Sequence, residues 1–451
     1  MLNTLYLPEL REMLAQNDAA GLRDFCQTLH PSRTSDFMEG LDSSEAWQVI
    51  VSADLDTRTQ IFSFFHWDRQ LKILREENRD QVAEVIGNLP ADDRVDLLSE
   101  IDKDIVAEIL AKLPLEERRD IMRLSQYPEG TAGAVMTTDV VKLKANATVR
   151  SALDQLANEA NDSEMVYYLY VVDEENILRG VVSARELVSA MRRPDRPLDD
   201  IIHTDLIAVR VMDDQEKVAD LVAKIDLLAI PVVDEQNHML GIITHDDIID
   251  VVLEEATEDA QQMAAVQPLE DSYMRTSVFE LSWKRGVWLT ILFFCSLFTA
   301  VALQTFHSEL LPWMIAFIPL VISSGGNSGS QSATLIITAI SRGDVSLKNW
   351  KKVVLREILM GILLGSTLAI LGFSTMYLFP SMASQAVVFK LVVPITLIMI
   401  VIAGTLTGSI LPLIFTRIGW DPAIMSNPLV AGIMDVLGIV IYVKVAALLL
   451  G

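Results

Sequence analysis

The sequence predicts a multi-domain chain with an all-α acidic part, an α/β part of two similar halves, a connecting helix and a helical membrane part. Three observations support this prediction: an uneven division of charge, two different repeats in the N-terminal part, and long apolar stretches in the C-terminal third. Residues 1–285 carry a net charge of −28, whereas the remainder carries +3. Such an acidic surface repels nucleic acid and attracts cations, so we expect no nucleic-acid partner.

Residues 1–130 are expected to form an all-α superhelical domain. A 24-residue repeat runs through this part, in units that begin at Leu41, Phe65, Leu89 and Leu113. Each unit has an apolar residue, then polar or acidic residues suited to a helix start, then an amphipathic pattern. A period of 24 accommodates two short helices that bury their apolar faces on the next pair. The acids Asp92, Asp93 and Asp96 are either ion ligands or solvated helix starts.

Residues 131–252 contain a duplication, with halves at about 131–195 and 196–252. The stretches 170–188 (YVVDEENILRGVVSARELV) and 231–249 (PVVDEQNHMLGIITHDDII) align residue for residue. Each reads as a buried strand, a polar turn, a second strand and a helix. The duplication resembles a tandem pair of cystathionine-β-synthase-like (CBS) motifs, which implies a regulatory module that senses nucleotides or ions.

The CBS resemblance also implies candidate nucleotide-binding residues. The family's glycine, hydroxyl and acid signature matches Gly180, Ser183 and Glu186 in the first half, and Gly241, Thr244 and Asp247 in the second. In that family the acid usually contacts a ribose. ATP is therefore a candidate ligand, although Glu186 replaces the commoner Asp and no glycine-rich phosphate loop is present.

Residues 253–284 are expected to form the helix that connects the acidic part to the membrane. From Ile225 to Met274 there are twelve acids and neither Lys nor Arg. On a helix, like charges at these spacings repel by roughly 0.2–0.5 kcal/mol per pair. Two interpretations stay open: a solvated acidic face, or bound divalent cations that neutralise it against other acids. The residues concerned are Asp247, Asp250, Glu254 and Glu258 on one helical face, and Asp214, Glu216 and Asp226 elsewhere.

Residues 285–451 are expected to form a transmembrane domain of five helices. The apolar stretches lie at roughly 286–306, 312–340, 353–379, 387–416 and 423–450. Basic residues cluster on the side of the large N-terminal part, for example at Arg342, Lys348 and Arg417. By the positive-inside rule, the N-terminus is cytoplasmic and, after five crossings of the cell membrane, the C-terminus lies outside. No cleaved targeting segment is expected, because charges interrupt the first residues.

Asp435 lies near the centre of the last apolar stretch, many ångströms from water. An Asp at the centre of a membrane helix costs roughly 2.5–3.5 kcal/mol, so it is expected beside a water-filled path, a partner charge or an ion. Lys444 is about nine residues away, over 13 Å along a helix, and is a poor partner. The alternative is a structural Asp that is protonated or hydrogen-bonded between helices.

A run of small and polar residues, Ser323 to Ser332, interrupts the second apolar stretch. Its three glycines allow a helix either to unwind or to approach another backbone closely, and exposed carbonyl groups there could line a cavity. A packing seam is the alternative, since Gly325 and Gly329 have the GxxxG spacing. The same spacing at 361/365 and 404/408 is interpreted as packing.

Small hard cations such as Mg²⁺ suit these residues. Mg²⁺ takes oxygen ligands, keeps several waters and needs only one or two carboxylates. The membrane part has no Cys and His cluster that favours softer metals. One Asp cannot neutralise a divalent ion, so a two-fold homodimer that brings together further acids and carbonyl groups is expected.

The order of these parts resembles the MgtE-type magnesium transporters. The runs 317–320 (FIPL), 325–334 (GGNSGSQSAT) and 421–442 (DPAIMSNPLVAGIMDVLGIVIY) carry the resemblance, which covers nearly the whole chain. It implies a homodimeric, Mg²⁺-selective channel whose cytoplasmic domains bind Mg²⁺ and close the pore through the connecting helix.

The resemblance also assigns residues to an ion pathway and to a sensor. Ser330 departs from the family pattern, in which Asn is frequent. The pathway residues are Asp435, Ala431, Gly326, Asn327, Gly329 and Ser330. The sensor residues are Asp214, Glu216, Asp226, Asp247, Asp250, Glu255, Glu258 and Asp259, with Asp93 and Asp96 as candidates from the helical domain.

Feedback gating is the expected mechanism. At low internal Mg²⁺ the acidic surfaces repel each other, and at high Mg²⁺ bound ions bridge them and pull the connecting helix onto the pore. The alternatives are a membrane-anchored CBS nucleotide or ion sensor without transport, and a less selective divalent cation transporter. A membrane enzyme is disfavoured, because no zinc, P-loop or nucleophile motif is present.

Overall fold

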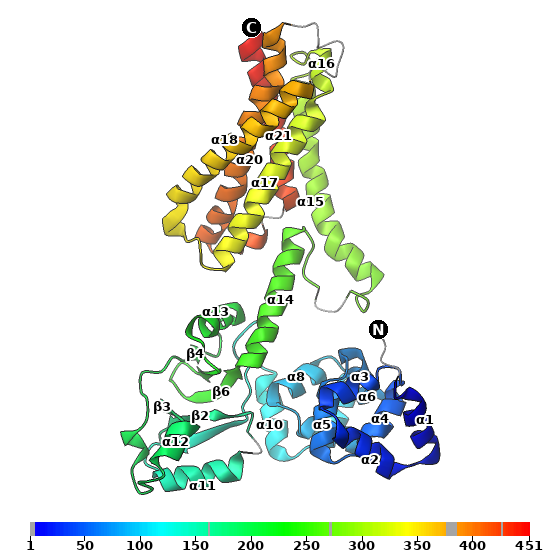
Figure 1. The fold of residues 1–451 in the computed structure, drawn as a ribbon, viewed down its shortest axis with the longest axis vertical. Coiled ribbons are helices and arrows are strands. Elements are labelled where there is room, and N and C mark those ends of the chain that lie inside the picture. Colours follow the sequence, from blue (N-terminus) through cyan, green and yellow to red (C-terminus); the bar gives the residue numbers. More distant parts are fainter. Residues whose placement is uncertain (1–4, 161–162, 270–272, 376–385, 425–426) are drawn as a thin grey trace. The chain divides into compact units, whose positions relative to one another are not determined.

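A computed structural model describes residues 5–160, 163–269, 273–375, 386–424 and 427–451 (Figure 1). The chain divides into two compact units, Met1–Leu253 and Glu254–Gly451. The division falls inside one helix, α14 (His245–Met263), so this helix connects the two units covalently. Parts of the expected stretches 353–379 and 423–450 lie outside the described residues.

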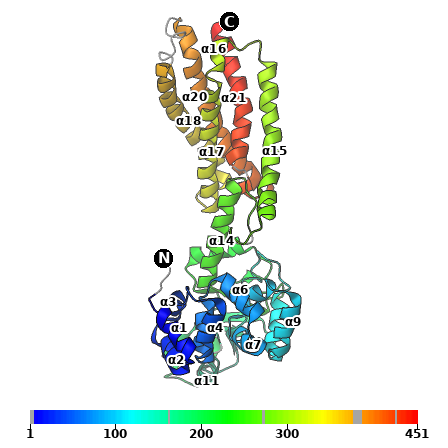
Figure 2. The same ribbon diagram turned by 90° about the vertical axis from the view of Figure 1, so that its right-hand side faces the viewer.

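The first part of the first unit is all-helical, as predicted (Figure 2). Helices that begin at residues 43, 67, 91 and 115 keep the 24-residue spacing, and a second helix follows each of the first three. The bounds are α1 (Leu7–Gln16), α2 (Ala19–Thr28), α3 (Pro31–Phe37), α4 (Ser43–Val51), α5 (Leu55–Ser63), α6 (Trp67–Glu76), α7 (Arg79–Gly87), α8 (Ala91–Ser99), α9 (Lys103–Lys112) and α10 (Leu115–Leu124).

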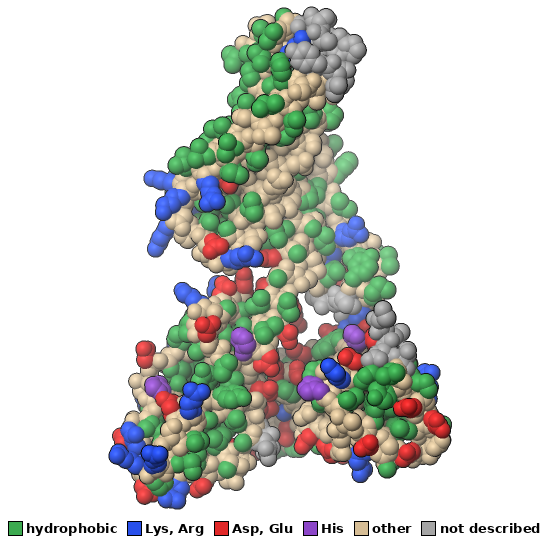
Figure 3. Space-filling model, in the orientation of Figure 1, with side chains coloured by type: hydrophobic (Ala, Val, Ile, Leu, Met, Phe, Trp, Pro, Cys, Tyr) green, Lys and Arg blue, Asp and Glu red, His purple; other side chains and the backbone are tan. Residues whose placement is uncertain are grey.

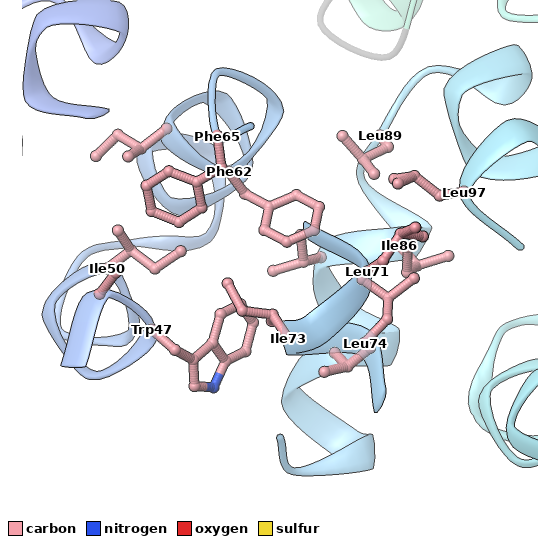
Figure 4. Close-up of a cluster of buried hydrophobic side chains, with 14 of the residues drawn as sticks. Trp47, Ile50, Phe62, Phe65, Leu71, Ile73, Leu74, Ile86, Leu89 and Leu97 are labelled. Carbon is pink, nitrogen blue, oxygen red and sulfur yellow. The ribbon is translucent and has the colours of Figure 1, made fainter. Parts of the chain in front are cut away.

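The apolar core of this helical domain follows the repeat. Trp47, Phe62 and Ile73 come from successive helices and are each at most 2% exposed (Figure 4). The polar residues at the repeat boundaries cap helices: Asp42 accepts a hydrogen bond from the backbone N–H of Glu45, and Asp54 from that of Thr57. Such caps satisfy backbone donors that the first turn of a helix leaves unpaired. The acidic helix starts therefore have a local structural role.

The second part of the first unit consists of two similar halves, as the duplication predicts. Each half has a three-stranded sheet in which the first pair of strands is parallel and the second antiparallel. The strands are β1 (Val140–Lys144), β2 (Met165–Val172), β3 (Leu178–Ser183), β4 (Val209–Arg210), β5 (Ala229–Val233) and β6 (Met239–Thr244). The helices are α11 (Val149–Glu159), α12 (Ala184–Ala190), η1 (Leu198–Asp200) and α13 (Gln215–Ile225).

The helical domain packs against the second half within the first unit. Ala91 of α8 and Leu124 of α10 belong to the same buried apolar cluster as Val218 and Ile248. The side chain of Arg94 forms an ion pair with Asp139 at 3.0 Å and is itself only 8% exposed. These contacts fix α8 beside the start of α14.

The second unit is a bundle of long helices. They are α15 (Val278–Thr305), α17 (Ile318–Ser341), α18 (Trp350–Thr375), α20 (Val387–Ile418) and α21 (Asn427–Leu450), with the short elements α16 (Pro312–Ile315), η2 (Leu347–Asn349) and η4 (Pro422–Ile424). Among the described residues, α15, α18, α20 and α21 are long and apolar enough to cross a membrane. α17 is not among them, because its polar run lowers its hydropathy, but its 24 residues reach about 36 Å.

Two details decide or correct the sequence-based expectations. Of the two alternatives for the glycine run, unwinding does not occur, since α17 is helical from Ile318 to Ser341. The helix expected at 253–284 instead begins at His245 and ends at Met263. Ala265 then adopts a left-handed backbone conformation with a φ of 58°, which cannot continue a right-handed helix. The next helix starts at Val278, where the side chain of Ser277 caps it.

Candidate functional site

α17 has two chemically different faces. One face packs inside the bundle and buries Gly325, Ser328, Gly329 and Ser332. The other exposes polar side chains four residues apart, and residues i and i+4 share a helix face. These are Ser323, Asn327 and Gln331, with half-buried Ser330 and Thr334 beside them. A helix among membrane spans therefore presents a polar stripe outward.

Glycines allow α17 to approach α20 closely. A Cβ atom built on Gly404 would lie 2.6 Å from the backbone carbonyl oxygen of Gly325, and one on Gly408 would overlap the carbonyl group of Gly329. Gly361 and Gly365 of α18 pack in the same way on α20. The packing interpretation holds for those pairs, and the structure also places Gly325 and Gly329 in a packing seam. The close approach fixes which face of α17 points outward.

α21 lies beside the polar stripe and contributes a matching face. Ser330 Oγ donates a hydrogen bond to the backbone carbonyl oxygen of Asn427 at 3.1 Å, and Thr334 Oγ1 donates to Asn427 Oδ1 at 3.2 Å. A Cβ atom built on Gly326 would contact the Cβ atom of Ala431 at 3.4 Å. We call the outward polar residues of α17, together with Asn427, Ala431 and Asp435, the α17–α21 face.

Asp435 lies two turns beyond Asn427 on this face, about 12 Å along α21. The side chain is half-buried, and within the described ranges it forms neither an ion pair nor a hydrogen bond. Lys444 lies elsewhere, with its Nζ 5.6 Å from the ring centroid of Phe306. A structural Asp hydrogen-bonded between helices therefore does not fit the described contacts. The carboxylate is available to water or to a cation.

The structure thus brings together most of the predicted pathway residues. Gly326, Ser330 and Ala431 lie where α17 meets α21, and Asn327 is exposed one turn along, with its Nδ2 3.2 Å from Ser323 Oγ. Gly329 lies in the packing seam instead. Hydroxyl, amide and carboxylate oxygens along one face suit a hydrated hard cation. The waters around such an ion form hydrogen bonds with these groups, and a carboxylate can contact the ion directly.

Glu357 of α18 is a second carboxylate in the bundle and was not predicted as a site residue. Its Oε2 accepts a hydrogen bond from Ser332 Oγ at 2.7 Å, and its backbone carbonyl oxygen lies 3.0 Å from Thr405 Oγ1. The contacts link α18, α17 and α20 on the side of α17 opposite the polar stripe. Glu357 is therefore placed to hold α17 in position.

The acids of the first unit form a cluster where α8 meets the start of α14. We call this the acidic cluster, and it consists of Asp92, Asp93, Glu164, Asp246, Asp247 and Asp250. Figure 3 shows acidic side chains gathered along this side of α14. Asp92 is 8% exposed, and within the described ranges its Oδ1 has no hydrogen-bond partner. A buried, unpaired carboxylate oxygen is costly, so this arrangement favours a bound cation or proton.

Burial and neighbouring acids raise the pKa values of Asp92, Asp93 and Glu164. Burial and then Asp247 hold the pKa of Asp92 well above its usual range. Burial, followed by Asp247 and Asp250, raises the pKa of Asp93 to about 6. Burial, followed by Asp247 and Asp246, raises the pKa of Glu164 to about 7. Asp93 and Glu164 nevertheless have exposed side chains that line one cavity of about 1000 Å³, so protein surrounds them on several sides while water still reaches both.

The described residues include no group of three Asp, Glu, His or Cys side chains already arranged to hold one metal ion. Carboxylates that repel each other are expected to stay apart in the absence of an ion. Mg²⁺ usually keeps several of its waters, which can bridge such separated carboxylates. The cluster therefore fits a hydrated divalent ion better than a compact site of direct ligands.

Other predicted sensor residues lie apart from the cluster. Asp214 caps α13 and pairs with Lys217 at 3.2 Å, while Asp226 ends the same helix about 18 Å away, so one ion cannot contact both. Within the second unit, Asp259 Oδ2 lies 3.4 Å from Ser341 Oγ, and burial and Asp421 raise the pKa of Asp259. The remaining residues are Asp96 on α8, Glu216 on α13, and Glu255 and Glu258 on α14.

The candidate nucleotide residues already have partners. Ser183 and Glu186 form a capping box at the start of α12, and Glu186 Oε1 lies 2.6 Å from His203 Nε2. The hydrogen bond from His203 lowers the pKa of Glu186 to about 2. Thr244 Oγ1 lies 2.5 Å from Asp247 Oδ2, and Asp247 belongs to the acidic cluster.

Sequence reasoning missed Asn427, Glu164 and Glu357. Asn427 follows a polar break and begins an apolar helix, which is a detectable signal for a pathway residue. Glu164 is far in sequence from the other acids. Its backbone N–H donates to the carbonyl oxygen of Asp139, whose side chain pairs with Arg94 of α8, and only this tertiary contact brings Glu164 near the other acids. Glu357 follows several basic residues near the start of α18, and no sequence pattern distinguishes it as a site residue.

Family models match three parts of the chain. The MgtE intracellular N domain matches residues 29–130, the CBS domain matches 132–193 and 198–254, and the MgtE divalent cation transporter model matches 318–445. The magnesium transporter MgtE of Thermus thermophilus is 37% identical over 335 residues, which are 72% of this chain and 72% of that protein. The magnesium transporter MgtE of Bacillus subtilis is 31% identical over 328 residues, which are 72% of this chain and 71% of that protein.

Two solved structures resemble the first unit. The soluble part of a magnesium transporter is 37% identical, with a TM-score of 0.51, and covers 55% of this chain and 97% of its own. The cytosolic domain of the Mg²⁺ channel MgtE in complex with ATP is 31% identical, with a TM-score of 0.50, and covers 54% of this chain and 98% of its own.

Proposed function

Because the chain belongs to the MgtE family of divalent cation transporters, we propose that it carries Mg²⁺ across the cell membrane under the control of its acidic first unit. The observation that supports transport most strongly is the α17–α21 face. Membrane helices expose a polar stripe there, and a carboxylate without a protein partner in the described ranges lies at its far end. Such a face is costly against lipid and suits a watery path.

The chemistry of this face fits a partly hydrated ion. Asp435 supplies the charge, while Asn327, Ser330 and the carbonyl oxygen of Asn427 offer hydrogen-bonding oxygens to the waters around Mg²⁺. A site of several weak contacts lets an ion enter and leave, as conduction requires. The passage of an ion forms no covalent bond, so no catalytic residue is proposed.

A homodimer completes this pathway. One chain supplies a single carboxylate to a divalent ion and leaves the α17–α21 face uncovered. In a two-fold assembly the same face of a second copy lies opposite, which doubles the acids and encloses the water. The bilayer covers the remaining apolar surface, such as the exposed side chains of Phe293 and Phe298 on α15.

Regulation by Mg²⁺ rests on the acidic cluster. An ion bound among Asp93, Asp247 and Asp250 stabilises the packing of α8 on the start of α14, because it removes the repulsion between carboxylates. A ligand shifts an equilibrium between two conformations only by its differential affinity for them. Mg²⁺ therefore favours the conformation in which these acids lie close together. Glu216, Asp214, Asp226 and Asp96 are proposed as further, weaker sites.

α14 is the proposed link between sensor and pathway. It begins at the acidic cluster, and in the second unit its last residues contact the bundle: Met263 packs on the cluster that contains Ala333 and Ile337. Ser341 of α17 bonds to Asp259. A displacement of α14 thus acts on the helix that carries the polar stripe. Glu255 and Glu258 are proposed ion contacts along this helix.

ATP is proposed as a second ligand of the CBS pair, since a relative's cytosolic domain was solved with ATP. Ser183, Glu186, Thr244 and Asp247 are the candidate contacts. Asp247 then serves two ligands, so ATP and Mg²⁺ at the acidic cluster influence each other's binding.

The proposed orientation of the chain in the membrane follows from the distribution of its basic residues. Arg342, Lys348, Lys351, Lys352 and Arg356 lie around the start of α18 and Arg417 ends α20, and Figure 3 shows basic side chains gathered at that end. The positive-inside rule places this end, and with it the acidic first unit, in the cytoplasm, and the C-terminus outside.

Flux measurements in reconstituted vesicles test transport directly. Replacing Asp435 by alanine removes the one carboxylate of the α17–α21 face, so uptake of Mg²⁺ is expected to fall to the level of empty vesicles. The matched control is Asp344→Ala, which removes an exposed acid in the loop after α17. Uptake by Asp435→Ala equal to that of Asp344→Ala would favour a membrane-anchored sensor without transport. Competition by Mn²⁺, Co²⁺ and Ca²⁺ in the same assay measures selectivity.

A further inference from the structure

A cavity of about 350 Å³ lies on the outer side of α18 and α20, away from the α17–α21 face. It is formed where the beginning of α18 meets the end of α20. The lining side chains are mostly apolar, with one cation: Leu347, Trp350, Val354, Leu413, Ile414 and Arg417. None of these residues belongs to the proposed pathway or to the acidic cluster.

The apolar part of the cavity is placed to meet hydrocarbon. α18 and α20 both have the length and hydropathy of membrane spans. Trp350 is 51% exposed and Ile414 is 46% exposed, so the cavity opens to the outside of the helix pair. Exposed apolar side chains of a membrane helix contact acyl chains. An acyl chain is therefore the natural occupant of this part.

The polar end of the cavity is cationic. Arg417 is the penultimate residue of α20 and forms no ion pair within the described ranges. Lys351 Nζ lies 5.6 Å from the ring centroid of Trp350. A guanidinium group binds a phosphate through two parallel hydrogen bonds, and Trp is enriched at the depth of lipid headgroups. This end thus suits an anionic group at the membrane surface.

We propose that this cavity is a binding site for an anionic phospholipid of the cytoplasmic leaflet, with an acyl chain against Val354 and Ile414 and the phosphate at Arg417. The combination of an apolar cavity and an unpaired cation selects an amphiphile. Free phosphate would leave the apolar lining uncovered, and a zwitterionic lipid carries a second charge that Arg417 and Lys351 repel. The proposal does not depend on which ion the protein transports.

Lipid titration of the full chain in detergent tests the proposal. Added phosphatidylglycerol is expected to raise the midpoint of thermal unfolding, because a ligand that binds only the folded state stabilises it. Phosphatidylcholine and inorganic phosphate are expected to give smaller shifts. Native mass spectrometry counts the phosphatidylglycerol molecules that remain bound to the folded protein.

Matched variants locate the site. Arg417→Gln removes the charge and is expected to raise the lipid concentration at half-saturation about tenfold, the loss of one charge-assisted hydrogen-bonding partner. Trp350→Leu removes the ring that flanks the cavity and is expected to weaken binding less. Arg342→Gln removes a basic residue at the same end that does not line the cavity, so it should bind as the parent does. Arg417→Lys keeps the charge but loses the two parallel hydrogen bonds, so its affinity is expected to lie between those of the parent and of Arg417→Gln.

Three results would overturn the proposal. Arg417→Gln and Arg342→Gln could retain phosphatidylglycerol equally, which would place the lipid elsewhere. Phosphatidylcholine could give the same shift as phosphatidylglycerol, which would remove the role of the charge. Inorganic phosphate could reproduce the whole shift, which would leave an anion site without a lipid. If Arg417→Gln does not fold, the comparison of Trp350→Leu with Arg342→Gln decides in the same way.

Discussion

The acidic cluster and Asp435 place carboxylates in opposite settings. In the cluster, six acids from α8, α14 and the segment before β2 crowd together, and burial and the neighbouring acids raise the pKa values of Asp92, Asp93 and Glu164. Asp435 has hydroxyl and amide groups on its face of the bundle, and no other acid of the described part of the chain belongs to that face. Crowded acids gain much from a bound divalent ion and hold it, whereas a single acid holds it weakly. The first setting suits a sensor and the second suits passage.

The two regions also depend on different forces. The α17–α21 face exists because glycine backbones pack closely, so it should be sensitive to side-chain volume. The acidic cluster exists because apolar contacts force acids together, so it should be sensitive to charge. Mutations that change only side-chain volume, or only charge, can therefore distinguish the forces that act in these two regions.

The largest loss of stability is expected when a side chain is added to the glycine packing between α17 and α20. In Gly408→Ala the new Cβ overlaps the carbonyl group of Gly329, which forces α17 and α20 apart. Overpacking of this kind costs about 1–3 kcal/mol, and thermal unfolding of the full chain in detergent measures it. Gly286→Ala is the matched control, because in the described part of the chain its added Cβ meets nothing within 4 Å apart from its chain neighbours and the backbone of its own helix. An equal midpoint for both variants would show that the seam tolerates separation.

A smaller loss of stability is expected when the hydrogen bond between Ser332 of α17 and Glu357 of α18 is removed. Glu357→Ala removes the acceptor of Ser332 and leaves a buried hydroxyl without this partner, at a cost of about 1 kcal/mol. Glu357→Gln keeps an acceptor oxygen and should retain most of the stability and of the uptake rate. If Glu357→Gln loses as much uptake as Glu357→Ala, the charge of Glu357 itself acts in transport, and Asp435 is not the only important acid of the bundle.

The pH dependence of the stability of the first unit tests whether the acidic cluster is sensitive to charge. The pKa of Asp93 is raised to about 6 from an ordinary value near 3.8, so the folded state favours its protonated form. The loss in free energy of unfolding caused by Asp93 is therefore absent below about pH 4, grows as the pH rises to about 6, and then stays constant. Asp93→Asn should be more stable than the parent at pH 7.5 in magnesium-free buffer, and this advantage should disappear at low pH.

Urea unfolding of residues 1–269 at several pH values measures this difference. The fragment is a reasonable choice, since the soluble part of a relative has been solved by itself. Asp104→Asn removes an exposed acid at the start of α9, away from the cluster, and should show no such growth with pH. A pH-independent advantage of Asp93→Asn would contradict the crowding of the cluster. Added Mg²⁺ should stabilise the parent more than Asp93→Asn.

Local patterns in the sequence predicted most of the fold. The 24-residue repeat gave the starts of α4, α6, α8 and α10, and the duplication gave both sheets, because these elements depend on neighbouring residues. The sequence left open whether α17 is continuous, because a packing seam and an unwound segment were both compatible with its glycines. Glycine weakens an isolated helix, and only the close packing against α20 compensates for it. The composition of the acidic cluster was predicted in part, since α14 supplies Asp247 and Asp250, whereas tertiary packing brings Glu164 to them.

The most direct test measures Mg²⁺ uptake by reconstituted Asp247→Asn while Mg²⁺ is varied on the side of the first unit. With Asp435 intact, uptake at low Mg²⁺ should equal that of the parent, but inhibition should require a higher Mg²⁺ concentration, because the cluster has lost one charge. An inhibition curve identical to the parent's would show that the cluster does not control the pathway. Loss of uptake at low Mg²⁺ would show that sensing and passage are not separate.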